Sequence, residues 1–127
     1  MARPNQVRRT AHYDVDGIAA TQTLLIIDLF GFGFGATGAY FHFEALAAII
    51  AGSTPFGTYL RYRVQGRLDG GSIANLEVNL EYSYADGVNT PRTLTIQEGA
   101  NGELAFQYSP GSGPNKVVID VKGVVGE

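Results

Sequence analysis

Cysteine is absent from the sequence, which excludes disulfide bonds, thiolate metal sites and a cysteine nucleophile. Tryptophan is absent too, and this argues against a carbohydrate-binding surface because tryptophan is the usual ring on which sugars stack. Charged residues make up only 17% of the chain and hydrophobic residues 45%, a composition that argues against disorder. The formal net charge of −3 argues against a general nucleic-acid binder, and we expect no specific nucleic-acid partner.

The start of the chain lacks the apolar run of a secretory signal peptide. Arg3, Arg8 and Arg9 come first, and His12 stands where that run should be. We therefore expect a cytoplasmic origin, with residues 1–17 forming an extended basic arm ahead of a single β domain at residues 18–127. A solvated terminus is the simplest interpretation of this arm. The alternative is that its arginines contact an acidic partner surface or a neighbouring copy.

Long uninterrupted hydrophobic runs are missing as well. Residues 18–52 are the most apolar stretch, but Asp28, His42 and Glu44 interrupt it and its glycines weaken any continuous helix. An ionisable group is costly at the middle of a bilayer. We therefore expect residues 18–52 to form buried protein core and not a membrane span.

The sequence does contain alternation of apolar and polar residues. In residues 58–84, two alternating runs flank Asp69-Gly70-Gly71-Ser72, which is typical of a hairpin turn. The first run places Arg61, Arg63 and Arg67 on its polar face, opposite Glu81 and Glu77 of the second. The apolar face is expected to hold Leu60, Tyr62, Val64 and Leu68 from the first run and Leu76, Val78, Leu80, Tyr82 and Tyr84 from the second. We predict a long antiparallel hairpin in this register.

Shorter alternating runs follow at residues 93–97, 104–108 and 117–121, with turn residues between them. This spacing predicts an all-β, mainly antiparallel domain, either a sandwich or a barrel of jelly-roll-like type. Residues 23–30 are typical of a strand buried on both faces. Residues 43–51 stay open between a strand and one short helix, because alanine favours a helix whereas Phe41 and Phe43 continue a strand.

A glycine–phenylalanine segment and one tyrosine are candidate contact residues. Phe30, Phe32 and Phe34 alternate with glycines, which predicts three rings on one face of a strand and room for close packing on the other. The segment lacks the lysine and hydroxyl residue of a phosphate-binding loop, so we expect no nucleotide there. Tyr59 lies on the arginine-bearing face of the predicted hairpin, where interfaces and sugar sites both favour aromatic rings.

Two groups of side chains are candidates for chemistry. His12, Asp14 and Asp16 alternate and could face one metal ion, but no fourth ligand accompanies them, and a polar strand is the favoured interpretation. Asp28, in an apolar run, would need a partner or a raised pKa if buried. Together with His42 and Glu44 it could serve as a general acid or base. No nucleophile motif supports catalysis, and we expect no cofactor.

Three hypotheses about function follow, in order of preference. The first is a non-catalytic structural protein that self-associates into a homo-oligomer or larger assembly, such as a coat, decoration or tail component of a virus or phage virion; this rests on fold-level analogy. The second is a sandwich or barrel that binds a small molecule or carbohydrate, with phenylalanines lining a pocket. The third is a cofactor-free isomerase or cyclase, which requires Asp28, His42 and Glu44 to converge on one cleft.

Overall fold

The alternating runs of the sequence form eight β-strands in the part of the chain that the structure describes. A computed structural model describes residues 6–29, 37–51, 57–69, 71–85, 93–110 and 115–126. The strands are β1 (Gln6–Ile18), β2 (Gln22–Asp28), β3 (Thr37–Ala51), β4 (Gly57–Asp69), β5 (Ser72–Ala85), β6 (Leu94–Glu98), β7 (Glu103–Tyr108) and β8 (Asn115–Gly126). A short 3-10 helix, η2 (Ala100–Gly102), joins β6 to β7.

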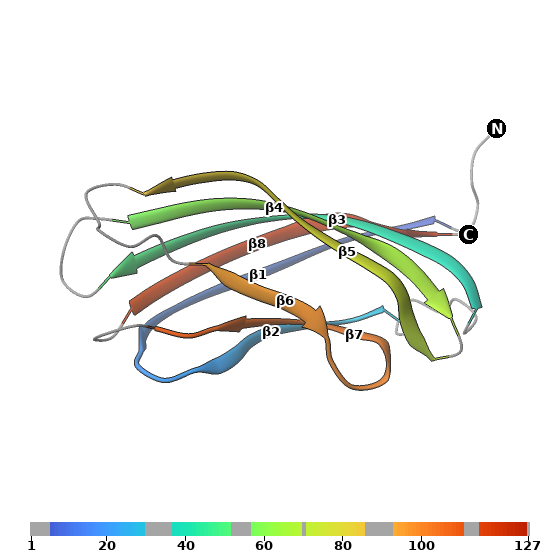
Figure 1. Cartoon of the computed structure of the whole chain (residues 1–127), viewed down its shortest axis with the longest axis horizontal. Coiled ribbons are helices and arrows are strands. Elements are labelled where there is room, and N and C mark those ends of the chain that lie inside the picture. The colour runs from blue at the N-terminus through green and yellow to red at the C-terminus, as the bar shows by residue number, and fades with distance from the viewer. Residues whose placement is uncertain are drawn as a thin grey trace.

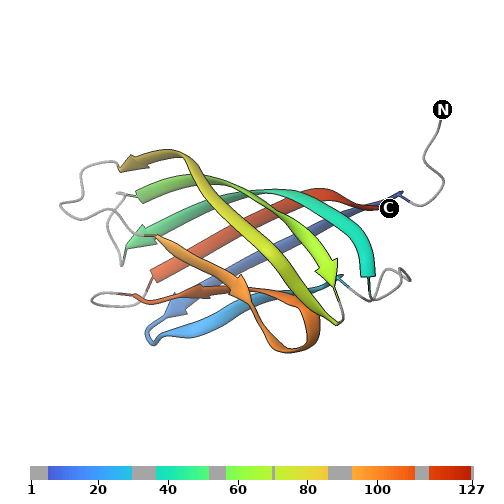
Figure 2. The same ribbon diagram turned by 45° about the vertical axis from the view of Figure 1, so that its right-hand side comes forward.

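The strands make two antiparallel sheets that face each other (Figure 1). The larger sheet has five strands in the order β1-β8-β3-β4-β5, and the smaller has three in the order β2-β7-β6. Figure 2 shows the smaller sheet lying beneath the long strands of the larger one. The orders β1-β8-β3 and β2-β7 are jelly-roll-like, whereas β3-β4-β5 is a meander. The predicted all-β sandwich is confirmed.

The segment expected to be a basic arm is a strand from Gln6 onward. β1 pairs with β8 from Gln6 opposite Gly126 to Val15 opposite Val117, and it forms one edge of the larger sheet. Ala11 and Tyr13 pack partly buried against the core. The charged residues of this segment obscured its period-two pattern in the sequence. The first and last strands thus lie side by side (Figure 1).

Residues 43–51, left open between helix and strand, belong to the 15-residue strand β3. Their buried side chains alternate strictly, at Phe43, Ala45, Ala47 and Ile49. β4 and β8 pair with β3 on either side, so hydrogen bonding to two neighbours outweighs the helix propensity of alanine.

β2 is buried on one face only, so the prediction of a strand buried on both faces is wrong. Leu24 and Ile27 face the core, but Ile26 is 53% exposed. β2 is an edge strand of the smaller sheet, and no strand or helix of the described residues covers its other side. The apolar run at residues 23–30 therefore predicted a strand correctly, but it did not predict that one face of this strand is exposed.

Two glycines leave room for large rings on the core side of the larger sheet. Phe41 of β3 stands opposite Gly66 of β4, where a Cβ would come within 2.8 Å of the ring. Phe43 stands opposite Gly123 of β8, where a Cβ would lie 2.1 Å from the His42 carbonyl oxygen and 2.6 Å from the Phe43 ring. The two rings pack on each other with centroids 6.1 Å apart. The packing of these two rings in the core therefore requires glycine at both positions.

Buried polar groups tie the two sheets and the ends of the sandwich together. The hydroxyl of Tyr62 in β4 reaches across the core to the backbone of Leu94 in β6. The hydroxyl of Tyr108 in β7 donates a hydrogen bond to the side-chain carbonyl of Asn115, at the start of β8. Each contact joins one sheet to the other, so they fix how the sheets are placed relative to each other.

The predicted hairpin is confirmed as β4 and β5, with Leu60, Tyr62, Val64 and Leu68 buried as expected. The guanidinium of Arg63 lies 3.2 Å from the carboxylate of Glu81, and that of Arg61 lies 4.0 Å from it, also as predicted.

The other predicted pair gives way to different partners. Gln65 donates a hydrogen bond of 2.8 Å to Glu77, and Arg67 lies 3.4 Å from Asp69. The cause is a β-bulge, because the register shifts between Gln65 and Arg67, where β5 carries an extra residue.

Candidate functional site

The side of the larger sheet that points away from the smaller sheet carries most of the candidate residues that the structure describes, and we call it the outer face. Along β8, β3 and β4 its side chains alternate with core residues. In its centre lie Thr10 and His12 of β1, Asp120 and Lys122 of β8, Glu44 and Leu46 of β3, Arg61 and Arg63 of β4, and Glu81 and Tyr82 of β5.

Acidic and basic side chains pair across neighbouring strands of the outer face. Lys122 lies 3.9 Å from Glu44, and Lys116 lies 4.0 Å from Asp14. Arg63 and Glu81 make the shortest arginine–carboxylate contact described above. Exposed pairs of this kind contribute at most about 1 kcal/mol each. Because opposite charges alternate, the face offers no strong field of one sign to a charged ligand.

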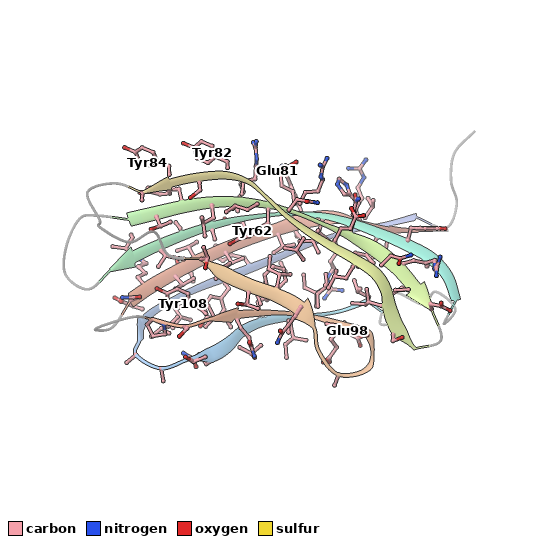
Figure 3. The ribbon with its side chains drawn as sticks, viewed as in Figure 1. Tyr62, Glu81, Tyr82, Tyr84, Glu98 and Tyr108 are labelled. Carbon is pink, nitrogen blue, oxygen red and sulfur yellow. The ribbon has the colours of Figure 1, made fainter. Side chains whose placement is uncertain are left out.

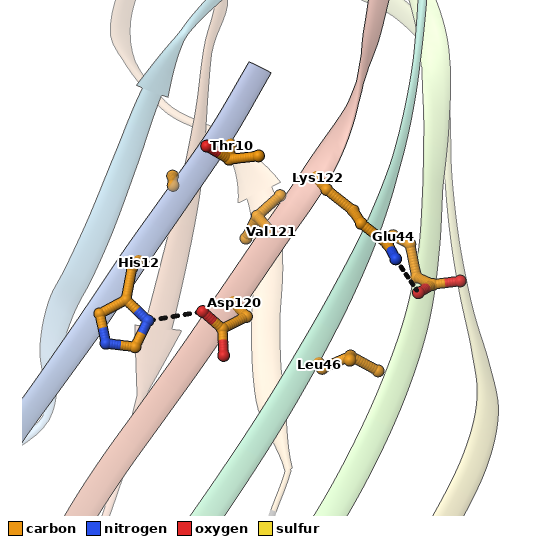
Figure 4. Close-up of a pocket in the computed structure, with 8 residues that line it drawn as sticks. Thr10, His12, Glu44, Leu46, Asp120, Val121 and Lys122 are labelled. Carbon is orange, nitrogen blue, oxygen red and sulfur yellow. Dashed lines mark hydrogen bonds and ion pairs between the residues drawn. The ribbon is translucent and has the colours of Figure 1, made fainter. Parts of the chain in front are cut away.

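The closest of these pairs joins His12 to Asp120. The imidazole Nδ1 lies 2.5 Å from the carboxylate oxygen (Figure 4). The hydrogen bond to Asp120, followed by the charge of that carboxylate, raises the pKa of His12 above its usual value of 6.5. Both side chains are exposed, so this is a surface ion pair and not a buried site.

Two open hollows adjoin on the outer face. One, of about 680 Å³, lies between His12, Asp120 and Lys122 (Figure 4). The other, of about 300 Å³, lies between Tyr59, Arg61 and Tyr82. Leu46 and Asp120 line both hollows, so the two form one shallow groove that runs across the strands.

A second β-bulge in β5 places Tyr82 and Tyr84 on the outer face, and the prediction that they lie on the apolar inner face is wrong. The register shifts at Glu81, so that Tyr82 stands opposite Arg61 and Tyr84 opposite Tyr59. Figure 3 shows Glu81, Tyr82 and Tyr84 pointing away from the smaller sheet. The rings of Tyr59 and Tyr84 have centroids 6.3 Å apart.

β5 exposes large apolar side chains on both of its faces. Val78 and Leu80 stand opposite the buried residues Val64 and Tyr62 and so share the inner face with them, yet they are 36% and 45% exposed. Tyr82 and Tyr84 are 52% and 49% exposed on the outer face. β5 is the last strand of the larger sheet, and among the described residues its only strand partner is β4.

The predicted contact residues fall in several places. Tyr59 of β4 lies on the outer face, and 45% of it is exposed. Arg8 of β1 is also exposed on the outer face. Arg9 stands opposite Gly123, on the other face of β1. Arg3 and the three phenylalanines Phe30, Phe32 and Phe34 lie outside the described residues.

The acid–base candidates do not converge. His42 and Glu44 lie on the outer face of β3, opposite Gln65 and Arg63. Asp28 ends β2 in the smaller sheet and is exposed, so the condition of burial under which it would need a raised pKa is not met. The arrangement lacks the shared cleft that catalysis by these three groups would need.

The candidate metal ligands of β1 face different partners. His12 binds Asp120, Asp14 faces Lys116, and the carboxylate of Asp16 accepts a hydrogen bond of 2.8 Å from the backbone N–H of Gly17. Within the described ranges, no group of three or more His, Cys, Asp or Glu side chains could hold a metal ion.

The alternation in the sequence does not predict that β5 is an exposed edge. Val78, Leu80, Tyr82 and Tyr84 continue the apolar pattern of the hairpin, which is why burial was expected. The sequence gives no signal of which strand ends the sheet.

Comparison with known proteins gives a fold but no family. No protein family and no curated protein matches this sequence. No helix among the described residues has the length and apolar character to cross a bilayer. The crystal structure of the Acinetobacter baumannii phage AM24 tailspike protein matches with a TM-score of 0.54 and 11% identity, over 94% of this chain. That of the Acinetobacter phage vB_ApiP_P1 tailspike protein gives 0.44 and 11% identity, over 92% of this chain.

This chain spans 25% and 22% of the lengths of those two tailspike proteins. At such low identity, the first match shows a shared fold alone. The chain therefore has a β-sandwich fold that also occurs within the AM24 tailspike protein.

Proposed function

We propose that this chain is a non-catalytic structural domain of a phage virion, of the coat, decoration or tail type, that works through self-association. The occurrence of the same fold within a phage tailspike protein supports the virion assignment as a fold-level analogy. The separation of Asp28 from His42 and Glu44 supports a role without catalysis.

The apolar exposure of β5 is the observation that carries this proposal. Edge strands of monomeric proteins are usually protected by charges, proline or a covering loop, because an exposed apolar edge pairs with other chains. β5 instead exposes Val78, Leu80, Tyr82 and Tyr84. Tyrosine and leucine exposed together on one strand favour a protein contact over a solvated surface.

The mass of the chain in solution tests self-association. Light scattering of the size-fractionated protein at micromolar concentrations should give a multiple of 13.6 kDa. Leu80→Lys should lower that mass, because a charge would enter the contact. Val15→Lys is the matched control, since Val15 is 42% exposed on β1 at the opposite edge. A mass of 13.6 kDa at every concentration would contradict the proposal.

The virion assignment has its own test. Mass spectrometry of purified particles, assembled from the genome that encodes this chain, should find its peptides in stoichiometric amounts. Their absence from the particles would contradict the virion assignment while leaving self-association intact.

Carbohydrate or small-ligand binding is a second candidate function, favoured by the groove of the outer face. Tyr59 and Tyr82 offer rings, and Arg61 and Asp120 offer hydrogen-bond donors and acceptors beside them. A glycan array probed with the wild-type chain and with Tyr82→Ala tests this function. Binding that Tyr82→Ala abolishes would support it, and no binding by the wild type would rule it out for those glycans.

A further inference from the structure

We propose that β5 pairs antiparallel with β5 of a second copy about a two-fold axis at Val78, so that the two larger sheets join into one. This inference rests on the proposed self-association and names its surface and its partner. The backbone N–H of Ile73, near the start of β5, already donates a hydrogen bond of 2.7 Å to the carboxylate of Glu98 in β6. Pairing with a second copy would satisfy backbone N–H and C=O groups along the rest of the outer edge of β5.

The two edges of the larger sheet differ in a way that selects β5. At the β1 edge, Arg8 and Arg9 point to opposite faces, and His12 and Asp14 follow, so charge protects that edge. β5 has two carboxylates, and side chains of β4 already engage both. Gln65 donates to Glu77, and Arg63 lies 3.2 Å from Glu81. The charges of β5 are thus turned toward its own sheet.

The sequence of β5 is self-complementary about Val78. In an antiparallel pair centred there, Leu76 stands opposite Leu80 of the second copy, and Val78 stands opposite its own copy. These apolar side chains share the inner face, beside Val64 and Tyr62 of β4. On the outer face, Glu77 stands opposite Asn79 of the second copy, and a carboxylate can accept a hydrogen bond from that amide.

The neighbouring registers that keep the faces matched are less favourable. A pair centred on Glu77 sets two glutamates directly opposite each other. A pair centred on Asn79 sets Glu77 opposite Glu81. Like charges directly opposite each other destabilise a sheet. A shift by a single residue would place apolar side chains opposite polar ones. The register centred on Val78 avoids all three conflicts.

The two bulges of β5 lie symmetrically about the same residue. The register shifts where β5 carries Asn75 and again where it carries Glu81, and each lies three positions from Val78. The regular stretch between them, from Leu76 to Leu80, is therefore centred on Val78. In the proposed dimer each Asn75 meets the Glu81 of the other copy, so both chains bend at matching positions.

The absence of cysteine allows a direct test with single cysteines. In the proposed register the two copies of residue 78 have Cα atoms about 4.5–5.5 Å apart, within the range that a disulfide spans. Residues 80 of the two copies lie four positions out of register, or about 14 Å apart. Val78→Cys should therefore cross-link to a covalent dimer under mild oxidation. Leu80→Cys alone and Leu76→Cys alone should not, whereas a mixture of these two variants should.

Val15→Cys, exposed on the opposite edge, is the matched control and should stay uncross-linked. Circular dichroism of each variant establishes that it folds. If the wild type is a multimer but Val78→Cys fails to cross-link, the β5 pairing is wrong while self-association stands. If Leu80→Cys cross-links as readily as Val78→Cys, the register is wrong. A wild-type chain of 13.6 kDa at every concentration would overturn both proposals.

Discussion

The hydroxyl of Tyr62 both accepts a hydrogen bond from the backbone N–H of Leu94, at 3.1 Å, and faces the carbonyl oxygen of the same residue, at 3.4 Å. Tyr62 belongs to the larger sheet and Leu94 to the smaller one. One side chain thus satisfies both backbone groups of the first residue of β6 and links that strand to β4.

Tyr62→Phe should lower the free energy of unfolding by about 1–3 kcal/mol, because the buried N–H and C=O of Leu94 lose their partner. Urea denaturation of the two proteins measures the difference. Tyr59→Phe is the matched control, since Tyr59 lies exposed on the same strand, and its effect should stay within about 0.5 kcal/mol. Equal losses in the two variants would contradict the role of the Tyr62 hydroxyl.

The same tyrosine should make stability depend on alkaline pH. Burial, opposed by the hydrogen bond to Leu94, raises the pKa of Tyr62 above its usual value of 10.0. The folded state therefore keeps its proton where the unfolded state loses it. The stabilising effect is fully present below pH 10 and is lost as pH rises through the folded-state pKa. The stability difference between wild type and Tyr62→Phe should accordingly shrink above pH 10, measured by urea denaturation at stepped pH.

Gly123→Ala should destabilise the fold strongly. A Cβ at Gly123 would lie 2.1 Å from a backbone oxygen of β3, so strands β3 and β8 would have to move apart. Overpacking typically costs about 1–3 kcal/mol. Gly99→Ala is the matched control, because its Cβ would meet its nearest atoms at 3.5 Å, an ordinary contact. Thermal unfolding of the two variants measures the contrast, and a stable Gly123→Ala variant would contradict the packing described.

His12 should titrate above pH 6.5 because of its hydrogen bond to Asp120. Its raised pKa means that the pair contributes to stability below pH 6.5 and that this contribution is lost as pH rises through the folded-state pKa. NMR titration of the imidazole measures the midpoint. Asp120→Asn should lower that midpoint more than Asp14→Asn, since Asp14 makes the weakest contribution to the shift. Equal effects of the two variants would contradict the pairing.

Arg63 and Glu81 should couple energetically, whereas Arg67 and Glu77 should not. The first pair lies at 3.2 Å, while Glu77 takes its hydrogen bond from Gln65. A double-mutant cycle should give about 0.2–1 kcal/mol for Arg63 with Glu81, falling as salt is added. The cycle for Arg67 with Glu77 should give a value near zero, and a larger value there than for the first pair would contradict the bulged register.

Most of the correct predictions came from the alternation of apolar and polar residues along the sequence. It located the hairpin, the buried side chains of β4, and the pairing of Arg61 and Arg63 with Glu81, because period-two burial is a local property of the chain. It failed where one extra residue in β5 reversed the pattern, so Tyr82 and Tyr84 emerged on the wrong face. A bulge depends on how two strands meet, and a single strand's sequence does not specify that.

The exposure of Asp28, Val78 and Leu80 could not be predicted from the sequence, for a related reason. Each lies in a run that is apolar enough for a core, and each is exposed because its strand ends a sheet. Which strand ends a sheet follows from the order of all the strands, and that order depends on contacts far apart in the sequence.

The adjacency of β1 and β8 has a consequence for how the chain folds. β8 lies between β1 and β3, so the larger sheet is split into two pieces until residues 115–126 have left the ribosome. Until then β1 has no partner in its own sheet, and β3 presents one unpaired side. Closure of that gap requires contacts across nearly the whole chain, which makes a slow, late step. A chaperone that holds the nascent chain should therefore increase the yield of this protein more than that of a meander of equal length.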